Sequence, residues 1–198
     1  MDYIIKLEQM MEENNGFLTA GEVTKLNIPR IYLKELLKRG MVTKLERGIY
    51  LKKGSKDDVL YRTQAKYGKI VYSHETALYL NKILKKEPPM ISATINTGYN
   101  PNTIKRRGMK IYTIKPELCS YGMIEVPSKS GNIIRTYDVK RTICDLIRSR
   151  SHIDKKLMAQ TLRDFVKKNP EEIEDLREYA EKFRIGKILD NYLSVLIL

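Results

Sequence analysis

Apolar side chains recur three or four positions apart in three segments near the start of the chain. These segments are residues 2–13, 19–26 and 30–39. The spacing places the apolar side chains of each segment on one face, and it therefore predicts three helices. Thr19 is suited to cap the second helix at its N-terminus, and Gly40 is suited to end the third.

Two short strand-like runs follow at residues 41–45 and 49–52, joined through Glu46-Arg47-Gly48. Glycine tolerates the positive φ that a tight turn requires, so these runs predict a β-hairpin. Three helices followed by a hairpin is the order of a winged helix-turn-helix. In such a domain the third helix enters the major groove of DNA, and the hairpin lies along the DNA backbone.

The rest of the chain combines strand-like runs with helical segments. A short helix is predicted over residues 59–67, and Ser73 is suited to begin another. The strand-like runs are residues 69–72, 91–96, 110–114, 122–126 and 133–137. Helical segments fill the chain from Val139 onward, and the last of them runs from Gly186 to Leu198. We therefore expect an α+β fold with two domains. Residues 1–56 form a winged helix-turn-helix DNA-binding domain, and residues 57–198 form a mixed or antiparallel sheet with a helical C-terminal part.

The charge of the chain is strongly basic and unevenly distributed. The 37 Lys and Arg residues exceed the 24 Asp and Glu residues, which gives a net charge of +13. Residues 30–56 contain 9 basic and 2 acidic side chains, and residues 135–168 contain 10 and 4. A surplus of this size favours a polyanionic partner such as nucleic acid.

The first basic zone coincides with the third helix and the hairpin. Its basic side chains alternate with the apolar residues of the helix, so they point away from the core. We predict that Arg30 and Tyr32 reach base edges and that Lys38, Lys44 and Lys53 bind phosphates. The full predicted DNA-binding set is Arg30, Tyr32, Lys34, Lys38, Arg39, Lys44, Arg47 and Lys53. The alternative is a purely structural winged helix that presents a solvated charged face.

The second basic zone lies outside the winged domain. A surface of this kind suits an extended DNA footprint, an RNA or an acidic protein partner, and charge that serves only solubility is the alternative. The predicted residues of this second surface are Arg106 and Arg107, which precede the zone, and Lys140, Arg141, Asp145, Arg148, Lys155 and Lys156 within it.

Three blocks of sequence resemble one known family. The run Leu-Leu-Lys-Arg-Gly-Met-Val-Thr-Lys-Leu-Glu-Arg-Gly-Ile-Tyr at residues 36–50 resembles the winged-helix segment of AbiEi-type antitoxins. Residues 72–81 and 141–146 resemble two later helices of the same proteins. The three blocks occur in the expected order over most of the chain.

The resemblance implies a transcriptional autorepressor and antitoxin of a type IV toxin–antitoxin system, which acts in phage abortive infection. Such a protein binds inverted repeats in its operator DNA and counters a nucleotidyltransferase toxin, and we expect it to be dimeric on the DNA. Arg141 and Asp145 are included in the second set because they fall in the third block. A winged-helix regulator whose basic C-terminal domain binds RNA or a protein partner is the alternative.

A weaker pattern suggests a nuclease. Glu125 and the run Asp138-Val139-Lys140 loosely resemble the acidic pair and lysine that hold Mg²⁺ in restriction-type nucleases, although Asp138 is equally suited to cap a helix. No phosphate-binding loop, nucleophile elbow or zinc-protease motif occurs in the sequence. We expect a binding protein, not an enzyme, without cofactor or metal, and we keep a magnesium-dependent nuclease as an alternative.

The two cysteines and the apolar runs bear on the cellular setting. Cys119 and Cys144 do not form a Cys-x-x-Cys pair, which favours a reducing cytoplasm. The longest apolar run, residues 195–198, is far shorter than the roughly 18 residues that span a membrane. We therefore expect a cytoplasmic protein without a membrane partner.

Overall fold

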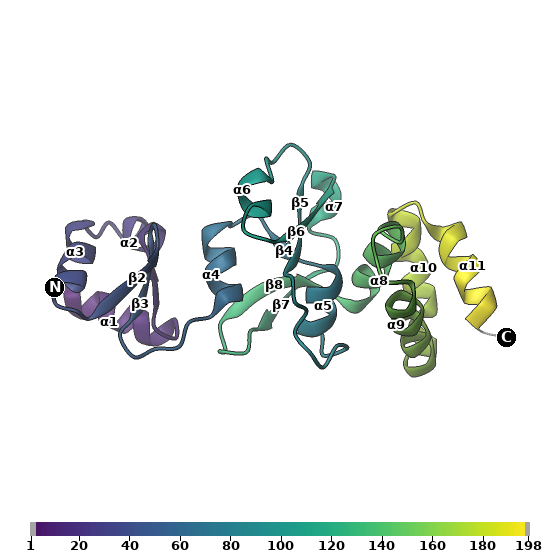
Figure 1. The fold of residues 1–198 in the computed structure, drawn as a ribbon, viewed down its shortest axis with the longest axis horizontal. Coiled ribbons are helices and arrows are strands. Elements are labelled where there is room, and N and C mark those ends of the chain that lie inside the picture. The colour runs from purple at the N-terminus through teal and green to yellow at the C-terminus, as the bar shows by residue number, and fades with distance from the viewer. Residues whose placement is uncertain (1–2, 197–198) are drawn as a thin grey trace. The chain divides into compact units, whose positions relative to one another are not determined.

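The computed structural model describes residues 3–196 (Figure 1). Asp2 and residues 197–198, which the sequence assigns to the ends of the first and last helices, lie outside the described residues. The chain forms two compact units. The N-terminal unit contains residues 1–68 and 125–134, and the C-terminal unit contains residues 69–124 and 135–198.

The N-terminal unit combines four helices with a small antiparallel sheet. Its elements are α1 (Tyr3–Glu13), β1 (Phe17–Thr19), α2 (Ala20–Lys25), α3 (Ile31–Lys38), β2 (Val42–Glu46), β3 (Ile49–Lys52) and α4 (Val59–Lys66). The strand order is β1-β3-β2. The helices and the hairpin lie where the apolar pattern predicts them, whereas β1 is an addition that the pattern does not predict.

The two faces of this sheet are covered by different helices. Leu18 lies opposite Tyr50 and packs in the apolar cluster formed with α1, α2 and α3. Phe17 lies opposite Leu51 and packs in a second cluster with Tyr61 of α4. Adjacent residues of a strand point to opposite faces, so the sheet is enclosed between the first three helices and α4.

Local hydrogen bonds fix the start of α2, and a glycine permits the turn of the hairpin. Thr19 accepts a hydrogen bond from the backbone of Glu22, and the Glu22 carboxylate accepts one from the backbone of Thr19. This capping box satisfies backbone donors that a helix start would otherwise leave open. Gly48 takes a positive φ of 78° in the turn between β2 and β3. Both features follow from the residue types that the sequence supplies.

Asp58 joins the start of α4 to residues from much later in the chain. Its carboxylate caps α4 by accepting from the backbone of Tyr61 and also accepts from Ser128 and Asn132. The Asn132 amide lies 2.8 Å from the carboxylate, and Asn132 also accepts from Asn15 at 3.1 Å. This buried cluster explains why residues 125–134 belong to the N-terminal unit.

The C-terminal unit contains most of a five-stranded sheet and the remaining helices. Its strands are β4 (Val71–Tyr72), β5 (Ser92–Asn96), β6 (Lys110–Ile114), β7 (Met123–Pro127) and β8 (Ile133–Tyr137), in the order β6-β5-β4-β8-β7. Its helices are α5 (His74–Leu80), α6 (Asn102–Lys105), α7 (Pro116–Cys119), α8 (Val139–Arg148), α9 (Lys155–Lys168), α10 (Ile173–Lys182) and α11 (Gly186–Leu196), with a short 3-10 turn at Pro170–Glu172. Strand β4 pairs antiparallel with β5 and parallel with β8, so the sheet is mixed. The expected α+β class is confirmed.

One apolar core joins the C-terminal helices to the sheet. It includes Leu78 of α5, Ile114 of β6, Ile147 of α8, Leu162 of α9 and Leu189 of α11. Figure 1 shows α8, α9, α10 and α11 grouped together, and α5 packs against α8. Among the described helices, none has both the length and the apolar character required to cross a bilayer.

Candidate nucleic-acid interface

Helix α3 has a buried apolar side and an exposed basic side. Leu33 and Leu36 are buried against the other helices. Arg30, directly before the helix, and Lys34 and Lys38 within it are exposed. These three positions are four residues apart and therefore follow one side of the helix. The helix thus presents a row of cations away from its own core.

The two residues predicted to reach base edges differ in their environment. The Nε of Arg30 donates to the Thr24 hydroxyl on α2 at 3.0 Å, which leaves the two terminal guanidinium nitrogens for another acceptor. These are the donors that bind guanine in a bidentate manner. Tyr32 is half-buried, and its ring lies 5.0 Å from that of Tyr3. Arg30 is therefore the more accessible of the two.

Arg39, at the end of α3, is held by a local ion pair. Its Nε lies 2.8 Å from the Glu35 carboxylate one turn earlier. This hydrogen bond lowers the pKa of Glu35. A partner phosphate would have to compete with Glu35 for Arg39, so we rank Arg39 below Lys34 and Lys38 as a contact.

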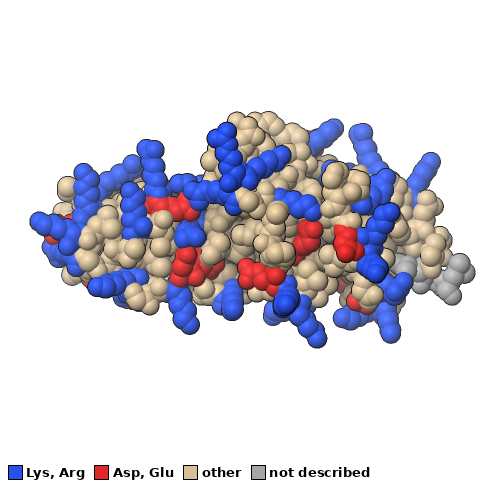
Figure 2. All heavy atoms as spheres, viewed as in Figure 1, with Lys and Arg blue, Asp and Glu red and all other residues tan. Residues whose placement is uncertain are grey.

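Ion pairs connect the hairpin to α4. Glu46 forms ion pairs with Arg62 at 3.8 Å and with Lys66 at 3.6 Å, both from α4. The Lys66 ammonium also lies 3.5 Å from the Arg47 carbonyl in the turn. The side chains of the predicted residues on or beside the hairpin, Lys44, Arg47 and Lys53, are exposed. In Figure 2, basic side chains project from the N-terminal part of the chain with few acidic side chains among them.

The second predicted set does not form one surface. Arg106 and Arg107 are exposed after α6, and Lys155 and Lys156 are exposed in the first turn of α9. Lys140 is bound by two carboxylates, those of Glu172 at 2.7 Å and Asp175 at 3.0 Å. The hydrogen bond to Glu172 is the main reason why the pKa of Lys140 is raised.

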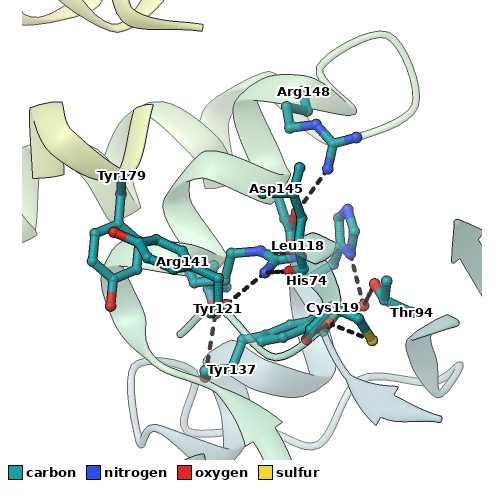
Figure 3. A network of polar contacts seen from close by, with 12 residues as sticks. His74, Thr94, Leu118, Cys119, Tyr121, Tyr137, Arg141, Asp145, Arg148 and Tyr179 are labelled. Carbon is teal, nitrogen blue, oxygen red and sulfur yellow. Dashed lines mark hydrogen bonds and ion pairs between the residues drawn. The ribbon is translucent and has the colours of Figure 1, made fainter. Parts of the chain in front are cut away.

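Arg141 and Asp145 were expected on this second surface, and that expectation is wrong. Arg141 is 0% exposed and Asp145 is 2% exposed. The Arg141 side chain donates to Asp145 at 3.0 Å and to the carbonyls of Leu118 and Tyr121 at 2.9 and 2.6 Å (Figure 3). The two residues form a buried ion pair because the whole middle of α8 is enclosed by neighbouring elements.

Asp145 is shared between two guanidinium groups. Besides Arg141, it binds the Nη1 of Arg148 at 3.2 Å, and Arg148 is partly exposed. The Arg141 guanidinium also lies over the rings of Tyr137 and Phe183, at 3.9 and 4.3 Å from their centres. Burial raises the pKa of Asp145, whereas the two arginines oppose that shift.

His74 lies beside this network and was not predicted as a site residue. Its ring stacks on Tyr112 with centres 3.4 Å apart, and its two nitrogens lie 2.9 Å from the Ser73 hydroxyl and 3.0 Å from the Ser149 hydroxyl. Burial, together with Lys110, Arg148 and Arg141, lowers the pKa of His74 well below its usual value of 6.5. The Ser73 side chain bonds this ring and does not cap α5, in contrast to the expectation from the sequence.

Asp138 has the role of a helix cap. Its carboxylate accepts from the backbone of Arg141 at 2.7 Å and from the Tyr179 hydroxyl at 2.7 Å. Both carboxylate oxygens are therefore engaged, which gives the Asp138-Val139-Lys140 run a structural explanation. In the described part of the chain, no group of three or more His, Cys, Asp or Glu residues is arranged to hold a metal ion.

Comparison with known proteins supports the resemblance in the N-terminal unit. Residues 8–51 match the family model described as "Transcriptional regulator, AbiEi antitoxin". The predicted resemblance to AbiEi-type antitoxins is thereby confirmed over these residues, which include α2, α3 and the hairpin. No curated protein matches the chain.

A solved structure is similar to most of the chain. It is the crystal structure of the RV2827C protein from Mycobacterium tuberculosis, with a TM-score of 0.55 and 12% sequence identity. The match covers 88% of this chain and 69% of that chain. At this identity the similarity establishes a shared fold and nothing about function.

Proposed function

We propose that this protein is a DNA-binding transcriptional autorepressor and antitoxin of a type IV toxin–antitoxin system, because residues 8–51 match the family model of AbiEi-type regulators. The observation that carries the proposal is the exposed basic side of α3, with Arg30, Lys34 and Lys38 spaced one turn apart. A row of cations on a helix that stands beside a basic hairpin suits the charge and the width of a DNA groove.

In this proposal the N-terminal unit is a winged helix-turn-helix. Helix α3 enters the major groove, and the hairpin β2–β3 lies along the backbone, where Lys44, Arg47 and Lys53 bind phosphates. Arg30 is the principal base contact because its tie to Thr24 orients the guanidinium before DNA binds. Inverted repeats in the operator would be occupied by two copies of the chain.

The C-terminal unit is assigned the antitoxin role, against a nucleotidyltransferase toxin. Exposed cations at Arg106, Arg107, Lys155 and Lys156 support contact with a polyanion or an acidic protein surface. The division into a DNA-binding domain at residues 1–56 and an antitoxin domain at residues 57–198 is part of this proposal. It differs from the two compact units, because α4 and residues 125–134 belong to the N-terminal unit.

Gel shifts with DNA from directly upstream of the protein's own gene test the proposal. The double variant Lys34→Ala, Lys38→Ala should abolish a retarded band that the wild type gives. A matched double variant, Lys155→Ala, Lys156→Ala, removes the same charge from the other unit and should retain the band. Equal binding by the wild type and the α3 double variant would refute the proposed interface.

A further inference from the structure

Two adjoining hollows lie in the C-terminal unit. Their volumes are about 410 and 390 Å³, and both are bordered by Thr113, Arg148 and Phe183. Together we call them the Arg148 groove. Each hollow falls in the size range of small-molecule sites. His74 and Ser149 border the first hollow, and Figure 3 shows Arg148 and His74 on the same side of the buried network.

The charge of the groove is mainly positive. Its basic lining residues are Lys115, Arg148, Arg150, Lys182 and Arg184, and its acidic ones are Glu117 and Asp145. Asp145 is already shared between Arg141 and Arg148. One carboxylate cannot neutralise two guanidinium groups, so a net positive charge remains on the Arg148 side. A concave surface that is partly screened from water strengthens the attraction of this charge for an anion.

Arg148 is held in place before any ligand arrives. Its Nη1 donates to Asp145 at 3.2 Å, and its guanidinium lies 5.6 Å from the centre of the Phe183 ring. The bond to Asp145 uses Nη1 and leaves Nε and Nη2 for a ligand. An arginine that is already oriented loses less side-chain freedom on binding, so its contact contributes more to affinity.

Arg184 occupies a backbone position that usually belongs to glycine. It follows the end of α10 with a φ of 56°, and the backbone of Ile185 bonds back to Ala180 in the pattern of a helix C-terminus. A side chain in this left-handed conformation is unfavourable, and glycine is common at this point. His74, which borders the first hollow, also has a positive φ, of 51°. Such strained residues cluster at binding sites.

We propose that the Arg148 groove binds a small phosphate-bearing ligand, with the phosphate held by Arg148, Lys182 and Arg184. Phosphate matches this lining because guanidinium groups bind its oxygens in pairs and an ammonium adds a point charge. The hydroxyl group of Thr113, which borders both hollows, supplies a further donor. The proposal concerns a different unit from the DNA interface and does not depend on it.

Calorimetric titration of the full chain at fixed ionic strength tests the proposal, with inorganic triphosphate and adenosine triphosphate as the two probes. Arg184→Gly should weaken binding at least about tenfold. The same change should leave the melting temperature equal to that of the wild type or up to about 3 °C higher, because glycine relieves the positive φ. Lys182→Ala should weaken binding without loss of folding. Arg163→Ala on α9 removes an exposed cation outside the groove and should leave binding unchanged.

The two probes distinguish the sources of the phosphate. Equal affinities would assign the site to the phosphates alone, and tighter binding of adenosine triphosphate would place the base in the hollow beside Tyr112. Failure of both probes to bind at millimolar concentration would overturn the proposal. Equal affinities of the Arg184, Lys182 and Arg163 variants for the probes would also overturn it, since that would indicate unspecific attraction to a basic protein.

Discussion

Arg141 and Asp145, one turn apart on α8, form an ion pair 3.0 Å long that solvent hardly reaches. Two backbone carbonyls and two aromatic faces also surround the arginine. A buried charge is tolerated only when such partners replace the water it has lost. Arg141 and Asp145 of α8 therefore depend on each other and on these partners for their burial.

Arg141→Ala should destabilise the C-terminal unit strongly. The substitution leaves the Asp145 carboxylate buried with Arg148 as its remaining cation, and breaking a buried pair costs about 3–5 kcal/mol. Urea unfolding, followed by circular dichroism, measures the loss. Arg177→Ala removes one partner of the exposed pair with Asp190 and should change the free energy of unfolding little. Similar losses in the free energy of unfolding of both variants would contradict the conclusion that a buried ion pair is more costly to break than an exposed one.

Asp58→Ala should destabilise the N-terminal unit by about 3 kcal/mol. About 1 kcal/mol comes from the lost helix cap, and the rest from the Ser128 and Asn132 donors that are left without their acceptor. Asp154→Ala is the matched control because Asp154 caps α9 at an exposed position. The control should cost only about 1 kcal/mol. Chemical denaturation of both variants would show whether Asp58 is more than an ordinary cap.

His74 should make stability depend on pH below about 6.5. The pKa of His74 is lowered in the folded chain. At pH values between this lowered pKa and 6.5, His74 is therefore protonated in the unfolded chain and neutral in the folded chain. The stabilising contribution is complete above about pH 6.5 and is lost as the pH falls, with a slope of up to about 1.4 kcal/mol per pH unit. The raised pKa of Asp145 acts in the opposite direction.

The variant His74→Asn isolates this contribution. Asparagine tolerates the positive φ at this position and does not titrate in this range. Urea unfolding between pH 5 and 8 should give a flatter stability profile for the variant than for the wild type. Parallel profiles would show that His74 is not the source of the pH dependence.

The sequence predicted the long elements because their patterns are local. The first three helices have regular apolar spacing, and Thr19 and Gly40 mark a start and an end that the structure retains. Strand β1 was missed because three residues are too few to show a period, and its identity depends on pairing with β3. The four-residue helices α6 and α7 were missed for the same reason of length.

The buried polar network could not be predicted from charge counts. Counting treats every arginine as a surface cation, whereas Arg141 is enclosed by groups from α7, from β8 and from Phe183, which directly follows α10. A spacing of four residues, as between Arg141 and Asp145, is compatible with an ion pair on one helix face but carries no information about its burial. The predicted DNA-binding residues are exposed apart from Tyr32, and their role remains a prediction.

The DNA complex should be strongly sensitive to salt. Roughly six phosphate contacts per protomer would give a slope near −5 in a plot of log affinity against log salt concentration. Removing Lys53 should reduce the steepness of that slope by about one. Fluorescence anisotropy over a series of salt concentrations measures both quantities. A slope near zero would mean that phosphate contacts do not carry the interaction.

The central claim is that the basic side of α3 contacts the bases while the hairpin contacts the DNA backbone. Its most direct test compares the affinities of two variants for operator and random DNA. Arg30→Ala should lose affinity mainly for the operator, by about 1–3 kcal/mol, so that its preference over random DNA falls. Lys53→Ala should lose similar affinity for both. Equal losses on operator and random DNA in both variants would contradict the assigned roles.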